Sequence, residues 1–331
     1  MHAETAPRDH RLPLSEGRRR FCAGLLLAAA PGAWASEPAA AFTTQDLEWV
    51  DAARQRPVPV RLYRPQAASL GAVPLVVFSH GIGGSRAGYA YLGRHWASRG
   101  VASLHLQHVG SDRQVWTGNP LGLVGRLQGA AQDTEAVARA QDVRFALDRV
   151  QAGDAGLQVD PRRIVAAGHS YGANTTLLVS GAVVQRAGRD VELRDPRIRA
   201  ALVISAPPFY GEDDLAPILR SVTVPSLHVT TLEDVIRIPG FQSGIEDRLR
   251  VFEATGSSEK WLTVFGTGSH GLFSGRLGDG APVLQATREL AYAFVRRVLD
   301  DDRHALDDWP RQHAGLIERF VGPGERRLSA S

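Results

Sequence analysis

The chain has 331 residues, of which 44% are hydrophobic and 22% charged, and its formal net charge is +3. This length and composition suit one large α/β domain with a substantial core, and no internal period indicates a repeat protein. Residues 1–35 hold five arginines and three acidic residues, so about +1 remains on residues 36–331, which gives no support for nucleic acid or an anionic membrane as a partner.

The N-terminal segment has the pattern of a targeting signal. Arg18-Arg19-Arg20-Phe21 precedes the apolar run 22–30, and Ala33-Trp34-Ala35 offers a cleavage site before Ser36. A twin arginine followed by a spacer and Phe resembles a Tat signal, which implies bacterial export in the folded state; an ordinary Sec signal is the alternative. The run is too short to remain as a membrane-spanning helix. We therefore predict a signal peptide over residues 1–35 and a periplasmic or secreted mature domain, which loses the only cysteine with the signal.

The rest of the chain alternates between strand and helix patterns. Two antiparallel edge strands are expected, at 43–50 and 58–63. Further strands are expected at 74–78, 101–106, 163–167, 199–205, 225–231 and 261–265, and helices near 86–99, 134–150, 172–185 and 283–300. Buried strands that alternate with helices predict an α/β fold with a mostly parallel, doubly wound sheet and helices on both faces. Its functional loops are expected at the carboxyl ends of the strands.

The pentapeptide Gly168-His169-Ser170-Tyr171-Gly172 follows the strand-like run 163–167 and opens a helix-like segment at 173–178. A nucleophile elbow needs such a sharp turn from strand to helix, which strains the serine backbone and exposes its Oγ. Glycines two residues before and after the serine avoid collisions across the turn. The alternative is a Gly/Ser loop without chemistry, but the strand before and the helix after favour Ser170 as a nucleophile.

A serine hydroxyl needs a histidine to take its proton and an acid to orient that histidine. His270 lies in a glycine-rich loop after the strand-like run 261–265, so its imidazole can lie over the serine. His228 lies inside a strand pattern and is expected in the core. His304 and His313 are expected in a polar tail. We therefore predict His270 as the general base.

The acid is best placed at Asp234, just past the strand 225–231. It comes 64 residues after Ser170 and 36 before the histidine, which gives the order Ser, acid, His. Glu233 is adjacent and chemically able, and Asp213 and Asp214 follow the preceding strand as further alternatives. Each of these carboxylates could instead be a solvated loop residue.

Two backbone N–H groups are expected to bind the oxyanion. One belongs to Tyr171, directly after the nucleophile, and the other is placed at Ile82, with Gly81 as its alternative, in the glycine-rich loop 79–85. Alternatively, this loop is an ordinary connection between a strand and a helix without a catalytic role. A phosphate cradle is less consistent with it, because no Lys-[Ser/Thr] follows the glycines.

Residues 107–130 show no clear periodicity and are expected to form a long loop that acts as a lid or a pocket wall. Trp116 in this loop is a candidate wall of the acyl or alcohol pocket, or else a rim residue over apolar surface. Tyr89, Phe209 and Phe273 are further candidates for substrate contact. His105 and His108 lack a third ligand at matching spacing, so we predict neither a metal nor another cofactor.

With these residues, the chain resembles the α/β-hydrolase superfamily and, more narrowly, serine esterases grouped with platelet-activating-factor acetylhydrolases and dienelactone-hydrolase relatives. The resemblance covers roughly residues 58–300 and rests on segments 77–85, 107–112 and 160–164, the elbow, and the acid and histidine loops. It implies a Ser170-Asp234-His270 triad. True dienelactone hydrolases use a cysteine nucleophile, so the serine puts dienelactone chemistry in doubt. Many relatives have a second glycine where this chain has Ala173, which leaves the elbow intact.

The activity expected from this resemblance is ester hydrolysis through an acyl-enzyme, on a small or lipid-like ester with a short acyl group. Phospholipase A2-like and polyester hydrolysis are alternatives in the same class. A binding protein on a hydrolase scaffold is an alternative of another class, and peptide hydrolysis would need a gating domain that the sequence does not indicate. The patterns indicate neither a stable membrane insertion after signal removal nor an oligomeric state.

Overall fold

The computed structural model describes residues 41–69, 71–238, 241–275 and 281–324. The predicted signal peptide and its cleavage site lie outside these residues. Among the helices of the described part, none has the length and apolar character needed to cross a membrane.

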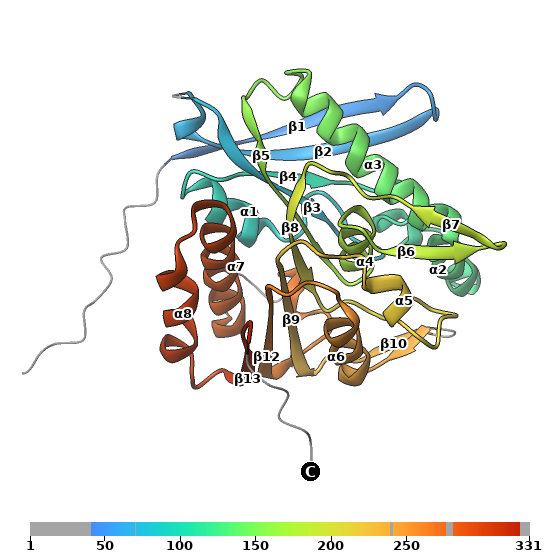
Figure 1. Ribbon diagram of the computed structural model, residues 1–331. Coiled ribbons are helices and arrows are strands. Elements are labelled where there is room, and N and C mark those ends of the chain that lie inside the picture. Colours follow the sequence, from blue (N-terminus) through green and yellow to red (C-terminus); the bar gives the residue numbers. More distant parts are fainter. Residues whose placement is uncertain (1–40, 70, 239–240, 276–280, 325–331) are drawn as a thin grey trace, which may run out of the picture. The chain divides into compact units, whose positions relative to one another are not determined.

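A nine-stranded sheet forms the centre of the described part, with the order β1-β2-β4-β3-β5-β8-β9-β12-β13 (Figure 1). Its strands are β1 (Phe42–Asp51), β2 (Arg56–Pro65), β3 (Val73–Ser79), β4 (Ala102–Leu106), β5 (Val159–His169), β8 (Ile198–Ile204), β9 (Ser226–Glu233), β12 (Lys260–Ser269) and β13 (Ile317–Val321). Within this order, the six strands β4-β3-β5-β8-β9-β12 pair in parallel, whereas β1, β2 and β13 pair antiparallel with their neighbours. The predicted, mostly parallel sheet with its antiparallel N-terminal edge is therefore present.

Helices cover both faces of this sheet (Figure 1). One face packs against α1 (Ala90–Ala97), α7 (Pro282–Asp300) and α8 (Arg303–Gln312), and the other against α3 (Asp133–Gln151), α4 (Tyr171–Val179), α5 (Ala216–Leu219) and α6 (Ile245–Ala254). Successive side chains of β3 alternate between the two cores: Leu75 and Val77 enter one, and Val76 and Phe78 the other. This alternation follows from the two-residue period of a strand, and it explains why β3 reads as a continuous apolar run.

The helix predicted over 172–185 is shorter in the structure. It ends at Val179 and is followed by a hairpin of β6 (Val183–Arg186) and β7 (Arg189–Glu192). The two residues between these strands have positive φ, 50° at Ala187 and 71° at Gly188, as a type I′ hairpin turn requires. The local turn geometry thus overrides the helical pattern that continues from the elbow.

The segment 107–130 is also more ordered than predicted. It contains two short 3₁₀ turns, η2 (Arg113–Trp116) and η3 (Pro120–Gly122), and then the helix α2 (Leu123–Ala130). Leu127 and Ala130 of this helix pack with Val115, and Ile82 and Ile238 lie against the same small cluster. The segment is therefore a packed flap rather than an irregular loop.

The expected polar tail is structured as well. Helix α8 buries Leu306 and Trp309, and the indole of Trp309 donates to the carbonyl of Ala286 at 3.1 Å. Strand β13 then pairs with β12 at the sheet edge. The remaining elements are the 3₁₀ turns η1 (Gln66–Ser69) and η4 (Leu272–Ser274) and the hairpin of β10 (Ile236–Ile238) and β11 (Phe241–Ser243).

Candidate active site

The predicted elbow is present at the junction of β5 and α4. Ser170 has φ 56° and ψ −125°, a conformation that a residue with a side chain rarely adopts. A Cβ on Gly168 would lie 2.1 Å from the carbonyl oxygen of Gly172, and a Cβ on Gly172 would lie 1.9 Å from that of Ser79. Only glycine fits at both positions, so the turn can close tightly and hold Ser170 at its tip.

The structure brings Ser170, His270 and Asp234 together. The Oγ of Ser170 lies 2.8 Å from Nε2 of His270, and the Nδ1 of His270 lies 2.7 Å from Oδ1 of Asp234. These residues follow or end β5, β12 and β9, so they meet because the carboxyl ends of neighbouring parallel strands lie at one edge of the sheet. The order and geometry are those of a nucleophile, a base and an orienting acid.

Asp234 is completely buried. Its Oδ2 accepts a hydrogen bond from Thr230 at 2.7 Å, and its Oδ1 accepts a second one from Arg248 at 3.2 Å. Burial alone would raise the pKa of Asp234, but the hydrogen bond and charge of His270 and the charge of Arg248 together hold it well below the ordinary value. Asp234 therefore stays anionic beside the imidazole. The alternative acid, Glu233, is exposed and accepts the N–H of Gly268 at 3.4 Å instead.

His169, the residue before the serine, supports the histidine loop. Its Nε2 donates to the backbone carbonyl of His270 at 3.0 Å, and its Nδ1 lies 2.8 Å from the hydroxyl of Tyr89. Burial, followed by the nearby charge of His270, lowers the pKa of His169 to about 3, so the ring is neutral. Because the carbonyl of His270 can only accept, the proton of His169 lies on Nε2 and the hydroxyl of Tyr89 donates to Nδ1. The pentapeptide marked the serine but gave no sign of this second role.

The hydrogen bonds of the glycine-rich loop 79–85, called the oxyanion loop below, distinguish Ile82 from Gly81 as the candidate donor. The N–H of Gly81 donates to the hydroxyl of Tyr89 at 3.3 Å, that of Gly83 to the carbonyl of Ser111 at 2.9 Å, and that of Gly84 to the carbonyl of Gly81 at 3.0 Å. The N–H of Ile82 makes none of these bonds, and Ile82 lies in the pocket wall beside the elbow. The N–H of Gly81 is thus engaged by Tyr89, which leaves Ile82 as the candidate donor of this loop.

A histidine in the same loop fixes the direction of this N–H group. The Nε2 of His80 accepts the backbone N–H of His108 at 3.1 Å, so its proton lies on Nδ1, which donates to the carbonyl of Gly81 at 2.7 Å. Burial and the charge of Arg139 keep the pKa of His80 well below its ordinary value. Because the peptide bond is planar and trans, holding the carbonyl of Gly81 directs the N–H of Ile82 to the opposite side.

Comparison with protein families identifies the family of the chain. The model of the alpha/beta hydrolase family matches residues 76–326, which include the loop, the elbow, Asp234 and His270. The chain belongs to the alpha/beta hydrolase family. A search of curated proteins found no match. The predicted α/β-hydrolase fold is confirmed, and membership of this family supports hydrolase activity in general.

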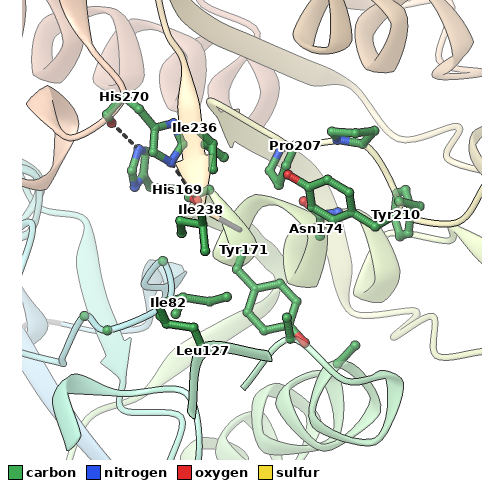
Figure 2. A pocket seen from close by; sticks show the side chains of 18 of the residues that line it. Ile82, Leu127, His169, Tyr171, Asn174, Pro207, Tyr210, Ile236, Ile238 and His270 are labelled. Atoms are coloured by element: carbon green, nitrogen blue, oxygen red, sulfur yellow. Dashed lines mark hydrogen bonds between the residues drawn. The ribbon is translucent and has the colours of Figure 1, made fainter. Parts of the chain in front are cut away.

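Ser170 and His270 line a pocket of about 620 Å³. Figure 2 shows His270 and His169 on one side of it, Ile82 and Leu127 below them, and Pro207 and Tyr210 across from them. The apolar part of its wall includes Leu178, Val184, Val191, Leu193 and Phe209. The wall residues come from many elements, among them α2, α3, α4, the β6–β7 hairpin, β10 and the loops after β3 and β8.

Three of the four predicted substrate contacts line this pocket: Trp116, Tyr89 and Phe209. Trp116 is 48% exposed, and its indole N–H donates to the carbonyl of Gly83 at 2.9 Å, which ties the flap to the oxyanion loop. The fourth, Phe273, was predicted wrongly. Its side chain is fully buried in the core that includes α7, because the turn η4 directs it inward beneath His169.

A second serine–histidine–aspartate set, which sequence reasoning missed, lies beneath the oxyanion loop. The Oγ of Ser79 lies 3.0 Å from Nε2 of His108, and the Nδ1 of His108 lies 3.0 Å from Oδ2 of Asp142. All three are at most 2% exposed, and Arg54 and Arg56 both donate to Asp142 at 2.9 Å. Burial, followed by the charges of nearby arginines, keeps the pKa of His108 well below its ordinary value.

His105 and His108, the two histidines considered as a possible metal pair, have different roles in the structure. His105 lies in β4 with its ring stacked on Phe78, while His108 belongs to the buried set. Within the described residues, no group of three His, Cys, Asp or Glu side chains is placed to hold a metal ion.

Proposed function

We propose that this protein is a serine ester hydrolase, of the carboxylesterase type, that acts through an acyl-enzyme. One observation carries the proposal: Ser170, on a strained turn, is hydrogen-bonded to His270, which is hydrogen-bonded to the buried Asp234. Ile82 and Tyr171, whose N–H groups we assign to the oxyanion site, line the same pocket as Ser170 and His270. Together these groups supply a nucleophile, a base, an orienting acid and an oxyanion site.

The reaction runs in two halves. The Oγ of Ser170 attacks the ester carbonyl while Nε2 of His270 takes its proton, and the N–H groups of Ile82 and Tyr171 bind the resulting oxyanion. As the carbonyl re-forms, the C–O bond to the alcohol breaks, and the imidazolium returns its proton to the leaving alkoxide. Water then attacks the acyl carbonyl while Nε2 of His270 takes its proton. The bond between the acyl carbon and Oγ of Ser170 breaks, the imidazolium gives the proton to Oγ, and the acid product leaves. Asp234 holds the proton of His270 on Nδ1 and stabilises the imidazolium throughout.

The proposed substrates are small esters with apolar, short acyl groups. The apolar side chains in the pocket wall favour such groups, and the indole of Trp116 lies in this wall on the side of the flap. Phospholipase A2-like or polyester hydrolysis is the second candidate within the same chemistry, because the pocket of about 620 Å³ has room for more than an acetyl group.

A fluorophosphonate probe tests the proposal directly. We expect it to label the purified protein at Ser170 and to leave the Ser170→Ala variant unlabelled, since only an activated serine attacks phosphorus at a useful rate. A panel of p-nitrophenyl esters from acetyl to palmitoyl then identifies the acyl preference, and a peptide-amide substrate serves as the negative control. Absence of labelling in folded protein would favour a binding protein on a hydrolase scaffold.

We also propose that the enzyme is exported, on the strength of the N-terminal sequence pattern alone. Replacement of Arg18 and Arg19 by lysine is expected to block export, because the Tat machinery reads the twin arginine, whereas inhibition of Sec is expected to have no effect. Cell fractionation and N-terminal sequencing, with Ser36 as the expected first residue, provide the measurement. Export of the double variant would identify an ordinary Sec signal.

A further inference from the structure

We propose that Arg139 of α3 is a positioning residue that holds the two halves of the oxyanion site in register. This inference rests on the proposed ester hydrolysis, since it assigns a role to Arg139 in that reaction. Arg139 does not line the pocket, and the sequence showed it only as one position of a helix. Its contacts reach both backbone segments that carry the oxyanion donors.

The first set of contacts is made with the loop that carries Ile82. One terminal nitrogen of Arg139 donates to the carbonyl of His80, two residues before Ile82. The other donates at 2.7 Å to Oγ of Ser111, whose backbone carbonyl accepts the N–H of Gly83. Arg139 is thus linked to the oxyanion loop on both sides of Ile82.

These hydrogen bonds fix the orientation of the peptide planes before Ile82. The plane between His80 and Gly81 is held by Arg139 at its carbonyl and by Tyr89 at its N–H. The next plane, between Gly81 and Ile82, is held at its carbonyl by the ring of His80 and by the N–H of Gly84. Two consecutive planes are therefore fixed, and the N–H of Ile82 follows their direction.

The second set of contacts is made with the segment that carries Tyr171. The guanidinium of Arg139 lies over the ring of Tyr171, 4.6 Å from its centroid. Its Nε donates at 3.0 Å to Oγ1 of Thr175, which in turn donates to the carbonyl of Tyr171 at 3.1 Å. One side chain thus connects the first turn of α4 to the oxyanion loop.

The chemistry of arginine suits this position. Its planar group offers donors in several fixed directions and a face for an aromatic ring, which a lysine ammonium does not. Arg139 is fully buried, and among the described residues no carboxylate is in hydrogen-bond or ion-pair contact with it. Burying such a cation is unfavourable for folding, whereas a fixed positive charge near a developing oxyanion is favourable for the reaction. Burial lowers the pKa of Arg139 to about 10, so the group remains cationic at neutral pH.

The test compares Arg139→Met and Arg139→Lys with Arg197→Met. Arg197 is a matched control because it also makes several hydrogen bonds, to Asp195 at 2.8 Å and to Asp148 at 2.7 Å, but lies at the amino end of β8, away from the catalytic edge of the sheet. For each variant, kcat and KM on p-nitrophenyl butyrate, the Ki of a trifluoromethyl ketone and the thermal midpoint are measured.

We expect Arg139→Met to lower kcat by roughly 10²-fold with KM changed less than about threefold, because misdirected donors act on the transition state rather than on bound substrate. The ketone, which forms an oxyanion on the enzyme, is expected to lose affinity in parallel. Arg139→Lys is expected to recover part of kcat. Arg197→Met is expected to lower the thermal midpoint and leave kcat of the folded protein unchanged.

If folded Arg139→Met protein has the same kcat and Ki as the parent protein, the proposal is overturned. A rise in KM with unchanged kcat would also overturn it. If that variant does not fold, Thr175→Val provides the test, because it removes only the link from Arg139 to the carbonyl of Tyr171 and is expected to lower kcat several-fold. Parent kcat in that variant would likewise overturn it. Failure of the proposed function is distinguishable, because parent protein that no fluorophosphonate labels at Ser170 would refute both proposals together.

Discussion

The chain contains two serine–histidine–aspartate sets with the same pattern of hydrogen bonds and very different surroundings. In Ser170–His270–Asp234 the two contacts are 2.8 and 2.7 Å, and in Ser79–His108–Asp142 both are 3.0 Å. The first set opens into a pocket that Ile82 and Tyr171 also line, and its serine lies on a strained turn. The second is sealed within the core, and its serine lies in the regular strand β3. The hydrogen-bond pattern alone therefore does not define a catalytic site.

The buried set instead connects elements of the fold. Its residues come from β3, from the loop after β4 and from α3, and the two arginines on Asp142 extend it to the turn between β1 and β2 and to β2 itself. We expect its loss to affect stability and the loss of the accessible set to affect turnover. The predictions below separate these two effects.

The largest expected difference is between the two serines. Ser170→Ala is expected to lower kcat by about 10⁴-fold or more without loss of stability, because no nucleophile remains. Ser79→Ala is expected to keep kcat within about tenfold of the parent but to lower the free energy of unfolding by about 1–3 kcal/mol, because His108 loses a buried partner. Steady-state kinetics and urea unfolding provide the measurements. Substantial turnover by pure Ser170→Ala protein would refute the assignment of the nucleophile.

The two aspartates are expected to divide in the same way. Asp234→Asn should lower kcat by roughly 10³-fold or more, because an amide favours the wrong tautomer of His270. Asp142→Asn should mainly lower stability, because it removes the buried carboxylate that Arg54, Arg56 and His108 share. Glu233→Gln serves as the control and is expected to have little effect on either quantity. A larger loss of kcat in Glu233→Gln than in Asp234→Asn would move the acid to Glu233.

The pH dependence of stability tests the buried set and the other buried histidines. Burial lowers the pKa of six histidines: to about 3 for His95, His105, His169 and His228, and well below the ordinary value for His80 and His108. Below pH ~6.5 the unfolded chain takes up protons that these rings do not accept in the folded state, so stability falls as pH falls toward about 3. Each ring contributes a slope of at most about 1.4 kcal/mol per pH unit.

Urea unfolding at pH 7.5, 6.5 and 5.5 measures this slope. His228→Leu provides the internal control, because His228 is buried in the core. Its removal should reduce the slope by at most about 1.4 kcal/mol per pH unit, which is the contribution of one proton. Equal stability at all three pH values would show that these rings take up protons in the folded protein as they do in the unfolded chain, and so would contradict their lowered pKa values.

The smallest expected effect concerns access to the Ser170–His270–Asp234 set. Trp116 lies in the pocket wall, so Trp116→Ala is expected to raise activity on octanoyl and longer esters relative to acetyl and butyryl esters. One methylene in an apolar pocket changes the free energy by about 1–3 kcal/mol, so the shift should be roughly tens-fold rather than complete. An unchanged acyl profile across the ester panel would identify Trp116 as a rim residue.

The sequence predicted those features whose signals are local. Apolar runs marked the parallel strands, and the spacing of glycines around Ser170 marked the elbow, because steric rules act over a few residues. The buried set joins Ser79, His108 and Asp142, which are separated by 29 and 34 residues and share no motif. Its existence depends on how β3, β4 and α3 pack together, and such tertiary contacts leave no period in the sequence.

The features that the sequence predicted wrongly or missed also depend on how distant segments pack together. Phe273 follows the histidine loop closely enough to suggest the pocket, but the direction of one 3₁₀ turn places it in the core. The roles of His169 and Tyr89 also depend on contacts between distant segments. Helix α8 buries Leu306 and Trp309 while most of its other positions are charged or polar, so composition alone made it resemble a tail.

Strand β13 has a practical consequence for recombinant work on this protein. It pairs antiparallel with β12, from Leu262 opposite Val321 to Phe265 opposite Ile317, and so covers the outer edge of a strand that leads to the histidine loop. A trimmed gene that omitted residues 317–321 as a dispensable tail would leave the edge of β12 open to pairing with other chains. Such a product is expected to collect in inclusion bodies, so affinity tags and fusion junctions belong beyond Val321.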